Sequence, residues 1–360
     1  MIKKIGVAIA ITAVLVAPFL SLISSSDTEA LPSSDVIFRP GYYVSSLNPV
    51  EKNIYDQLDD IFSTEYSSPN PSDDLQIELN IPEGVFFEGD DAEQSAKKYV
   101  TDLVEKVLTV KYYSDVRSIW LWNYPTITPN YEITVNNAEI TIAGSVKDVK
   151  IPIQCKFTLT VEDRFKGKIT ESIKAVLEES HNYEKSDDEI TTIRNIYSKL
   201  SSIEVKDDED GKISTVYDAL VEHKSSSAGI AIAFKTMASI NNISSIVVTG
   251  KYYENSDEGK DHFWNYVEYD DKWYLLDATI SDCLMLGYNE TLSGTPITAI
   301  LNKSDINGLY SLNPPNLNRD SYEFPDERSF LEKNGMNFII AAIGILVIAC
   351  IILAIRQGLA

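Results

Sequence analysis

The sequence predicts an α+β protein that is followed by a membrane-spanning helix near the C-terminus. Stretches with apolar residues three and four positions apart predict helices, stretches of strict alternation predict strands, and both kinds occur along the chain. The chain has 360 residues, of which 44% are apolar, so it is long enough for one large or two modest domains. Residues 338–355 carry no charged side chain and predict the membrane helix.

Both ends of the chain carry membrane signals. Lys3 and Lys4 precede the apolar run 5–23, a pattern typical of an export signal that is either removed or kept as an anchor. The run at 338–355 is long enough to cross a hydrocarbon core of about 30 Å. Arg356 follows this run, and basic residues at both ends predict that both ends are cytoplasmic. We therefore expect the middle of the chain to be extracellular.

The chain is strongly acidic, with 54 acidic against 31 basic residues and a formal net charge of −23. Such a surface repels phosphate backbones, so we expect no nucleic-acid partner. The sequence has only three histidines and no CxxC or HExxH pattern, which argues against a zinc site. The stretch 206–211 resembles a calcium loop, but Lys206 stands at its first ligand position. We expect a solvated loop there, and neither a metal nor a cofactor.

The first half of the chain reads as a mixture of helices and strands. Asn48 as N-cap, Pro49 as first helical residue and Glu51 as capping-box acid predict a helix from residue 48 to about 62. Beyond it we expect a strand at 75–81, a helix at 90–108, two strands around a turn near Asn136–Asn137 within 131–142, a strand at 151–161, and helices around 167–179 and 187–202. Cys155 and Cys283 are compatible with a disulfide or with two free thiols.

The second half centres on a helix at 227–241 with little polar surface. Ile230, Ile232, Phe234 and Met237 cover most of its circumference, so we expect it to be buried. Around it the sequence predicts a short helix at 214–223, a strand at 244–253, and two strands at 262–269 and 272–279 that are joined across Asp270–Asp271, with irregular structure over 283–325.

A two-residue turn at Asp270–Asp271 brings an imidazole and a carboxylate together. With that turn, Trp264 pairs with Asp277 and His262 pairs with Thr279, so His262 and Asp277 are diagonal neighbours on one face. Their Cα atoms are then roughly 7–8 Å apart, within reach for the two side chains. An aspartate in that place fixes the histidine tautomer and stabilises the imidazolium. A turn longer by one residue separates the pair.

Ser227 is the candidate nucleophile, because it stands at the start of the buried helix. The helix dipole and free backbone N–H groups at such a position favour a developing negative charge. The alternative is that Ser227 is only the N-cap of this helix, a position that serine favours without any catalysis. The surrounding SSSAG is not a nucleophile elbow, because Ser225 stands where GxSxG requires glycine.

Residues 213–282 resemble the transglutaminase-like core of bacterial and archaeal surface proteins, which has a papain-like fold of a helix packed on an antiparallel sheet. The resemblance extends more weakly over about 40–310. It rests on small residues at the start of the helix and on a glycine after the following strand. It also rests on a His-x-Trp-Asn motif and, at the end of the region, on a Trp-Tyr pair and an Asp-x-Thr motif. The matching residues are Gly229, Ala231, Gly250, His262, Trp264, Asn265, Trp273, Tyr274, Asp277 and Thr279.

The family's nucleophilic cysteine falls on Ser227. The resemblance therefore implies catalytic positions at Ser227, His262 and Asp277, and binding positions at Trp264, Asn265 and Thr279. Family clefts accept glutamine side chains or extended peptides. A thiol can be stored as a thiolate beside histidine and a hydroxyl cannot, so we expect an inactive or impaired domain. It would bind protein or peptide, such as cell-wall peptide, at the cell surface.

Two alternatives to this reading remain. The domain is an active peptidase, amidohydrolase or transglutaminase that uses a Ser227-His262-Asp277 triad, or it is a purely structural ectodomain. In each case the expected organisation is a signal peptide or anchor at 1–25, a linker at 26–40, an N-terminal α+β region at 41–185, the transglutaminase-like domain at 186–310, a linker at 311–337 and the membrane helix at 338–355.

Overall fold

The computed structural model describes part of the chain, in ten stretches: residues 41–81, 91–126, 129–135, 140–142, 147–149, 153–206, 212–253, 259–288, 297–299 and 309–325. The predicted signal or anchor, the linker at 26–40, most of the calcium-like loop and the predicted membrane helix at 338–355 lie outside these residues. Within them, no helix combines the length and the apolar character that crossing a bilayer requires. What is described is a mixed α+β fold with antiparallel sheets.

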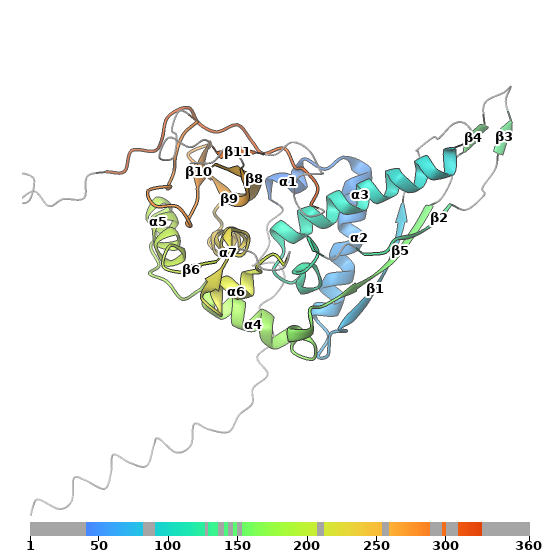
Figure 1. The fold of residues 1–360 in the computed structure, drawn as a ribbon, viewed down its shortest axis with the longest axis horizontal. Helices are drawn as coiled ribbons and strands as arrows, with labels where there is room; N and C mark the ends of the chain where they lie inside the picture. The colour runs from blue at the N-terminus through green and yellow to red at the C-terminus, as the bar shows by residue number, and fades with distance from the viewer. Residues whose placement is uncertain are drawn as a thin grey trace, which may run out of the picture.

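The first half of the chain forms a three-stranded antiparallel sheet in the order β1-β5-β2, with helices packed against it (Figure 1). The predicted helix start is confirmed, because the Glu51 amide donates to the Asn48 side chain at 3.0 Å and the Asn48 amide donates to Glu51 at 2.9 Å. The elements are α1 (Tyr42–Ser45), α2 (Pro49–Tyr66), β1 (Asp74–Ile81), α3 (Ala92–Ser114), η2 (Ile119–Leu121), β2 (Glu132–Val135), β5 (Ile153–Thr160) and η3 (Asp163–Phe165).

The two strands predicted within 131–142 are present but are not each other's partners. Strand β2 pairs with β5, whereas β3 (Ile140–Ile142) pairs with β4 (Lys147–Val149). The pairing through β5 places Ile133 opposite Cys155. Strand β5 has eight residues and is buried on one face, so it offers β2 more pairing positions than the three-residue β3 does, which favours the non-local pairing.

The second half surrounds α7 (Ser227–Ile240), which Figure 1 shows almost end-on between a sheet and the short helix α6. All twelve residues from Ala228 to Ser239 are buried, as the sequence predicted. The sheet is antiparallel in the order β10-β9-β8-β11. The elements are α4 (Ile169–Ser180), α5 (Glu189–Leu200), β6 (Glu204–Val205), α6 (Val216–Leu220), β7 (Lys224–Ser225), β8 (Ser245–Tyr252), β9 (Lys260–Tyr269), β10 (Lys272–Leu276) and β11 (Ile297–Ala299).

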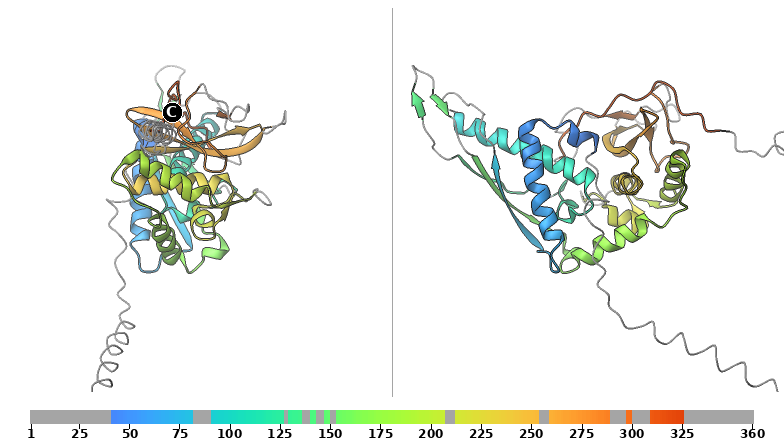
Figure 2. Two further views of the ribbon diagram at one scale, coloured as in Figure 1. Left: turned by 90° about the vertical axis from the view of Figure 1, so that its left-hand side faces the viewer. Right: turned by 180° about the vertical axis from the view of Figure 1, so that it is seen from behind.

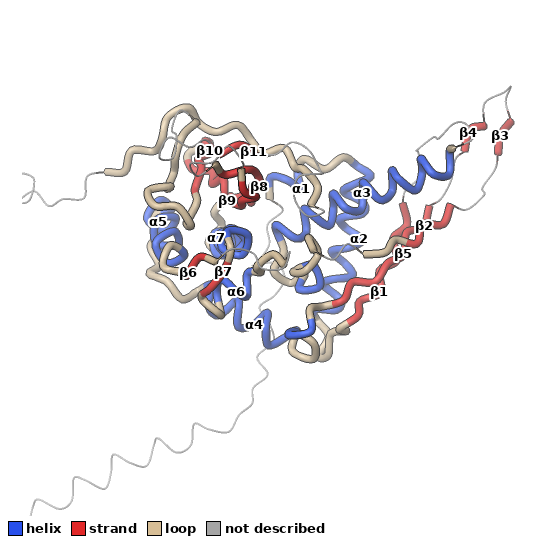
Figure 3. The backbone as a smooth tube through the Cα atoms, in the orientation of Figure 1, coloured by secondary structure: helices blue, strands red, loops and turns tan. Residues whose placement is uncertain are grey.

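The two halves share one continuous apolar core. The two larger sheets lie at opposite sides of the molecule, with α2 and α3 between them (Figure 3). The Tyr43 hydroxyl donates to the Val247 carbonyl at 3.0 Å, and the Arg164 guanidinium holds both oxygens of Asp218 at 2.6 and 3.0 Å. These contacts cross from one sheet region to the other and fix their relative position.

Residues 309–325, most of them in the predicted linker at 311–337, pack against the folded domain. The Asn318 amide donates to the Trp273 carbonyl of β10 at 2.7 Å, and the Tyr322 amide donates to the Met285 carbonyl at 2.9 Å. The Tyr322 ring also packs edge-on against Tyr274 and Phe324. This segment is the orange-red stretch that passes over the β8–β10 sheet in Figure 2, and its aromatic side chains explain why it folds back.

The two described cysteines are not paired. Cys155 lies in β5 and Cys283 follows β10, and both are free, buried thiols. Burial raises the pKa of the Cys155 thiol to about 12 and raises that of Cys283 well above its ordinary value. Neither thiol is therefore expected to ionise at neutral pH.

The turn between β9 and β10 generates a stability prediction. Asp270 and Asp271 have φ values of 52° and 57°, a backbone conformation that glycine adopts without a Cβ penalty. We expect Asp271→Gly to raise the free energy of unfolding by about 1 kcal/mol, measured by urea unfolding of the full-length chain in detergent. Asp271→Asn, which removes the charge and keeps a Cβ, is the control. Equal gains from both variants would mean that charge repulsion, not backbone strain, limits the turn.

Candidate active site

The β9–β10 hairpin has the predicted register. Lys272 pairs with Tyr269 and Leu276 pairs with Asn265, so the turn contains two residues. The ladder ends at Leu276, and Asp277 lies directly beyond the strand. The even-length turn that the imidazole–carboxylate contact requires is therefore present.

His262 and Asp277 form a close pair. The His262 Nε2 atom is 2.6 Å from Asp277 Oδ2, and the Asp277 side chain is only 1% exposed. The other carboxylate oxygen accepts from the backbone N–H of Thr279 at 2.9 Å and from its hydroxyl at 2.6 Å. The Asp277 amide donates in turn to the Cys283 carbonyl at 2.9 Å. With both oxygens engaged, the carboxylate has a fixed orientation toward the ring.

Ser227 is the first residue of α7 and is not its N-cap. The N-cap is Ser226, whose backbone is extended and whose side chain makes no capping bond. The N-cap interpretation of Ser227 is thus wrong by one residue. The Ser227 Oγ atom accepts a hydrogen bond from the Phe263 amide at 3.2 Å, and no hydrogen bond joins it to the His262 ring.

These contacts decide what the site can do chemically. Because Nε2 faces the carboxylate, it carries the ring proton, which leaves Nδ1 as the basic nitrogen. A base at that position serves acyl transfer when a nucleophile donates to it. Here the Ser227 hydroxyl oxygen instead accepts a hydrogen bond from the Phe263 amide, which draws electron density away from the oxygen. The pair His262–Asp277 is assembled, but its link to Ser227 is not.

Two of the three predicted binding residues are inside the core. Asn265 is 2% exposed, and its amide nitrogen donates to the carbonyls of Ala231 at 2.9 Å and Ile246 at 3.2 Å, which ties α7 to the sheet. Trp264 is 1% exposed, and its ring lies parallel to His262 at a centroid distance of 6.3 Å. Both therefore support the site from within.

Thr279 is the predicted binding residue that lies beside the imidazole. Its hydroxyl is 3.4 Å from His262 Nε2 and is partly exposed. The sequence-based prediction missed Tyr252, whose ring packs 5.3 Å from the His262 ring. Tyr252 pairs with Lys260 across β8 and β9, two residues from His262 and therefore on the same face. The long connection between these strands did not fix their register in advance, so no sequence signal identified this neighbour.

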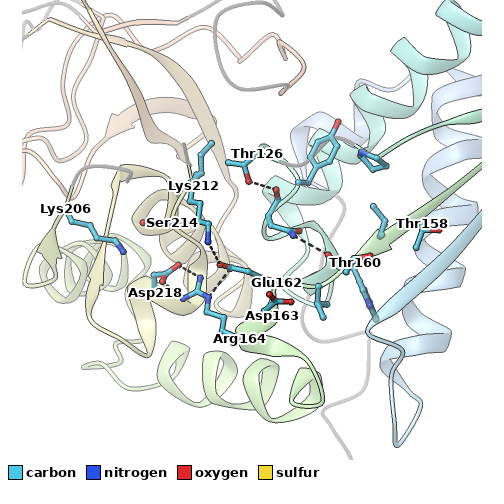
Figure 4. A pocket seen from close by; sticks show the side chains of 17 residues that line it. Thr126, Thr158, Thr160, Glu162, Asp163, Arg164, Lys206, Lys212, Ser214 and Asp218 are labelled. Atoms are coloured by element: carbon cyan, nitrogen blue, oxygen red, sulfur yellow. Dashed lines mark hydrogen bonds and ion pairs between the residues drawn. The ribbon is translucent and has the colours of Figure 1, made fainter. Parts of the chain in front are cut away.

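A separate cavity of about 700 Å³ lies between η3, β5 and the segment before α6 (Figure 4). Neither Ser227 nor His262 lines it. Its arginine, Arg164, is neutralised by Asp218 at 2.6 Å and by Glu162 at 3.0 Å. The charges of this cavity are thus largely satisfied by the protein itself, and they supply no group to the His262–Asp277 pair.

Comparisons with known proteins give only weak structural likeness. No family model and no curated protein sequence matches the chain. A protein from Cytophaga hutchinsonii, described as a candidate cysteine protease, is 10% identical over 48% of this chain and 69% of its own, with a TM-score of 0.26. LapG from Legionella pneumophila is 12% identical over 34% and 69%, with a TM-score of 0.22. The periplasmic domain of TgpA from Pseudomonas aeruginosa is 9% identical over 57% and 69%, also at 0.22.

The close approach of α6 to the start of α7 generates a prediction. A Cβ atom on Gly229 would lie 2.2 Å from Ser225 Oγ and 2.3 Å from the Thr215 carbonyl oxygen. We expect Gly229→Ala to lower the free energy of unfolding by about 1–3 kcal/mol, because a backbone carbonyl cannot give way cheaply. Helix propensity alone acts in the opposite direction, by about 1 kcal/mol. Urea unfolding measures the difference, and a stabilised variant would mean that the two helices can separate.

Proposed function

We propose that this chain is a membrane-anchored transglutaminase-like domain protein of papain-like fold, in which acyl transfer is lost or strongly impaired. The domain binds extended peptide, such as cell-wall peptide, at the cell surface. One observation carries the proposal: the Ser227 hydroxyl accepts a hydrogen bond from the Phe263 amide and makes none to His262. The site keeps an oriented imidazole without a coupled nucleophile.

The chemistry of the nucleophile supports an impaired domain. A thiol beside histidine can be held as a thiolate, which attacks without a further proton transfer. A serine hydroxyl must lose its proton during the attack, so it needs the imidazole within hydrogen-bonding distance. Ser227 lacks that contact, although Asp277 orients the imidazole as a working base requires.

A working serine triad is the second candidate function. The 2.6 Å contact between His262 and Asp277 favours it, because a purely structural histidine has no need of a buried, fully engaged carboxylate. A small rotation about χ1 of Ser227 would move its hydroxyl from the Phe263 amide toward the His262 ring. The impaired domain and the serine triad therefore differ in the hydrogen-bond partner of the Ser227 hydroxyl. The reactivity of this hydroxyl distinguishes them.

The extracellular placement of the domain rests on the sequence. The basic residues Lys3, Lys4 and Arg356 flank the two apolar runs, and the acidic middle lies between them. A surface position also suits the net charge of −23, which keeps the domain soluble and repels anionic polymers.

Restoring the thiol tests the proposal. We expect Ser227→Cys in the full-length chain to react with iodoacetamide at pH 6.5 roughly tenfold faster than the same variant with His262→Ala, because the imidazolium stabilises the thiolate. Peptide mass spectrometry locates the label. The buried thiols of Cys155 and Cys283 give a low background, because burial raises the pKa of both. Equal rates in the two variants would contradict the transglutaminase-like arrangement.

Wild-type protein is treated in parallel with a fluorophosphonate probe. Under the proposal Ser227 is not labelled, since its hydroxyl has no base. Labelling of Ser227 that disappears in His262→Ala would overturn the impaired-domain proposal and establish the serine triad.

Peptide binding is tested separately. We expect saturable binding of extended glutamine-containing L-peptides, measured by fluorescence anisotropy, and no binding of the same peptides built from D-residues, because a groove for an extended chain is chiral. Equal anisotropy changes for both series, or none, would leave only a structural role for the domain.

A further inference from the structure

A second polar feature lies at the other end of α7 from the candidate active site. Lys235 is 6% exposed, and its ammonium group donates to the Ser239 hydroxyl at 2.5 Å. Lys235 is eight residues beyond Ser227, which corresponds to about 12 Å along a helix. The feature is thus separate from the His262–Asp277 pair, and the inference below does not rest on the proposed function.

Lys235 differs from the other buried lysine in its lack of a counter-charge. Lys111 is fully buried, and two carboxylates, those of Asp59 and Asp115, form ion pairs with it. For Lys235, no carboxylate of the described residues lies within ion-pair distance. A buried ammonium without an anion is costly, which makes Lys235 a candidate for binding a ligand.

Lys235 lines a cavity of about 380 Å³ between α1, the end of α7 and the β9–β10 hairpin. Ser245 also lines the cavity, is 2% exposed, and has a hydroxyl without any hydrogen-bond partner. A volume of this size falls in the range of small-molecule sites. Lys235 is thus a buried cation at the border of this space, whereas the Ser245 hydroxyl has almost no accessible surface and does not face it.

The cavity is also lined by a negatively charged side chain and by two aromatic rings. Glu268 of β9 lines it, and among the described residues it forms no ion pair. Tyr42 and Trp273 line the cavity as well, and their rings meet edge to face at a centroid distance of 5.6 Å. A cation, an anion and an apolar surface thus border one cavity, and the two charges do not neutralise each other.

We propose that this cavity binds a small zwitterion, an α-amino acid with an apolar side chain. The ligand's carboxylate accepts from the Lys235 ammonium, and its ammonium pairs with Glu268. Its side chain lies against Tyr42 and Trp273. A zwitterion is the ligand class that satisfies both unpaired charges at once, whereas a simple anion would face Glu268 and a simple cation would face Lys235.

The protonation of Lys235 agrees with this assignment. Burial lowers the pKa of Lys235 to about 8, which leaves the group mostly protonated at neutral pH and able to hold a carboxylate. Glu189, the first residue of α5, is close enough to Glu268 for the two carboxylates to repel each other, and this negative charge favours the ligand's ammonium on that side.

Three matched ligands test the proposal on the full-length chain in detergent at pH 7. L-phenylalanine carries both charges, 3-phenylpropanoate lacks the ammonium, and phenethylamine lacks the carboxylate. Isothermal titration calorimetry should give L-phenylalanine the highest affinity, with each single-charge ligand weaker by roughly tenfold or more. No detectable binding of L-phenylalanine at about 1 mM, or equal affinity for all three, would overturn the assignment.

Two variants locate the contacts. Lys235→Met keeps the length of the side chain and should abolish the advantage of L-phenylalanine over phenethylamine. Glu268→Gln should abolish its advantage over 3-phenylpropanoate. Lys52→Met, on the exposed face of α2, is the matched control and should leave all three affinities unchanged. Unchanged L-phenylalanine affinity in Lys235→Met would show that any binding occurs elsewhere. The comparison of ligands on wild-type protein remains decisive if a variant fails to fold.

Discussion

The helix α7 is buried on every side, and this burial governs how both halves of the chain are arranged. From Ala228 to Ser239 each residue of this helix is buried, so apolar partners are needed around its whole circumference. The β8–β9 strands cover one side, and α3, α4, α5 and α6 cover the others. The first half of the chain therefore helps to cover α7, and one apolar core extends through both halves.

The same constraint sets the two ends of α7 in different environments. At its start, the absence of a side chain at Gly229 lets the Thr215 carbonyl come close, and Ser227 meets the backbone of β9. Toward its end, Lys235 carries a charge into the interior beside Val247 and Tyr113, and it also lines the cavity that Glu268 borders. A helix buried all round has no solvated face on which to place polar residues. Each polar residue it does carry therefore has a specific partner or borders a cavity.

The site consists of two units that are positioned independently. The β9–β10 hairpin and the loop after it assemble His262, Asp277 and Thr279 through local pairing, and this unit is complete. Ser227 is positioned by α7, which packs against strands that are distant from Ser227 in the sequence. The Ser227 hydroxyl accepts a hydrogen bond from the Phe263 amide. Phe263 follows His262 in the chain, but the hydroxyl makes no hydrogen bond to the His262 ring. A fold of this kind can keep a precise His–Asp pair while the nucleophile position changes its chemistry.

Most of the longer helices and strands, the buried character of α7 and the contact between His262 and Asp277 could be predicted from the sequence. These follow from local rules: the capping box at Asn48, the apolar periodicity, and a two-residue turn that fixes strand register. The irregular structure expected over 283–325 was wrong at β11 (Ile297–Ala299), a three-residue strand too short to leave a pattern. The folded chain alone shows that β2 pairs with β5, that Asn265 serves packing, that Tyr252 flanks the imidazole, and that Lys235 has no carboxylate partner among the described residues. Each of these depends on segments that are far apart in the chain, whose relative position is set by the shared core and by no local pattern.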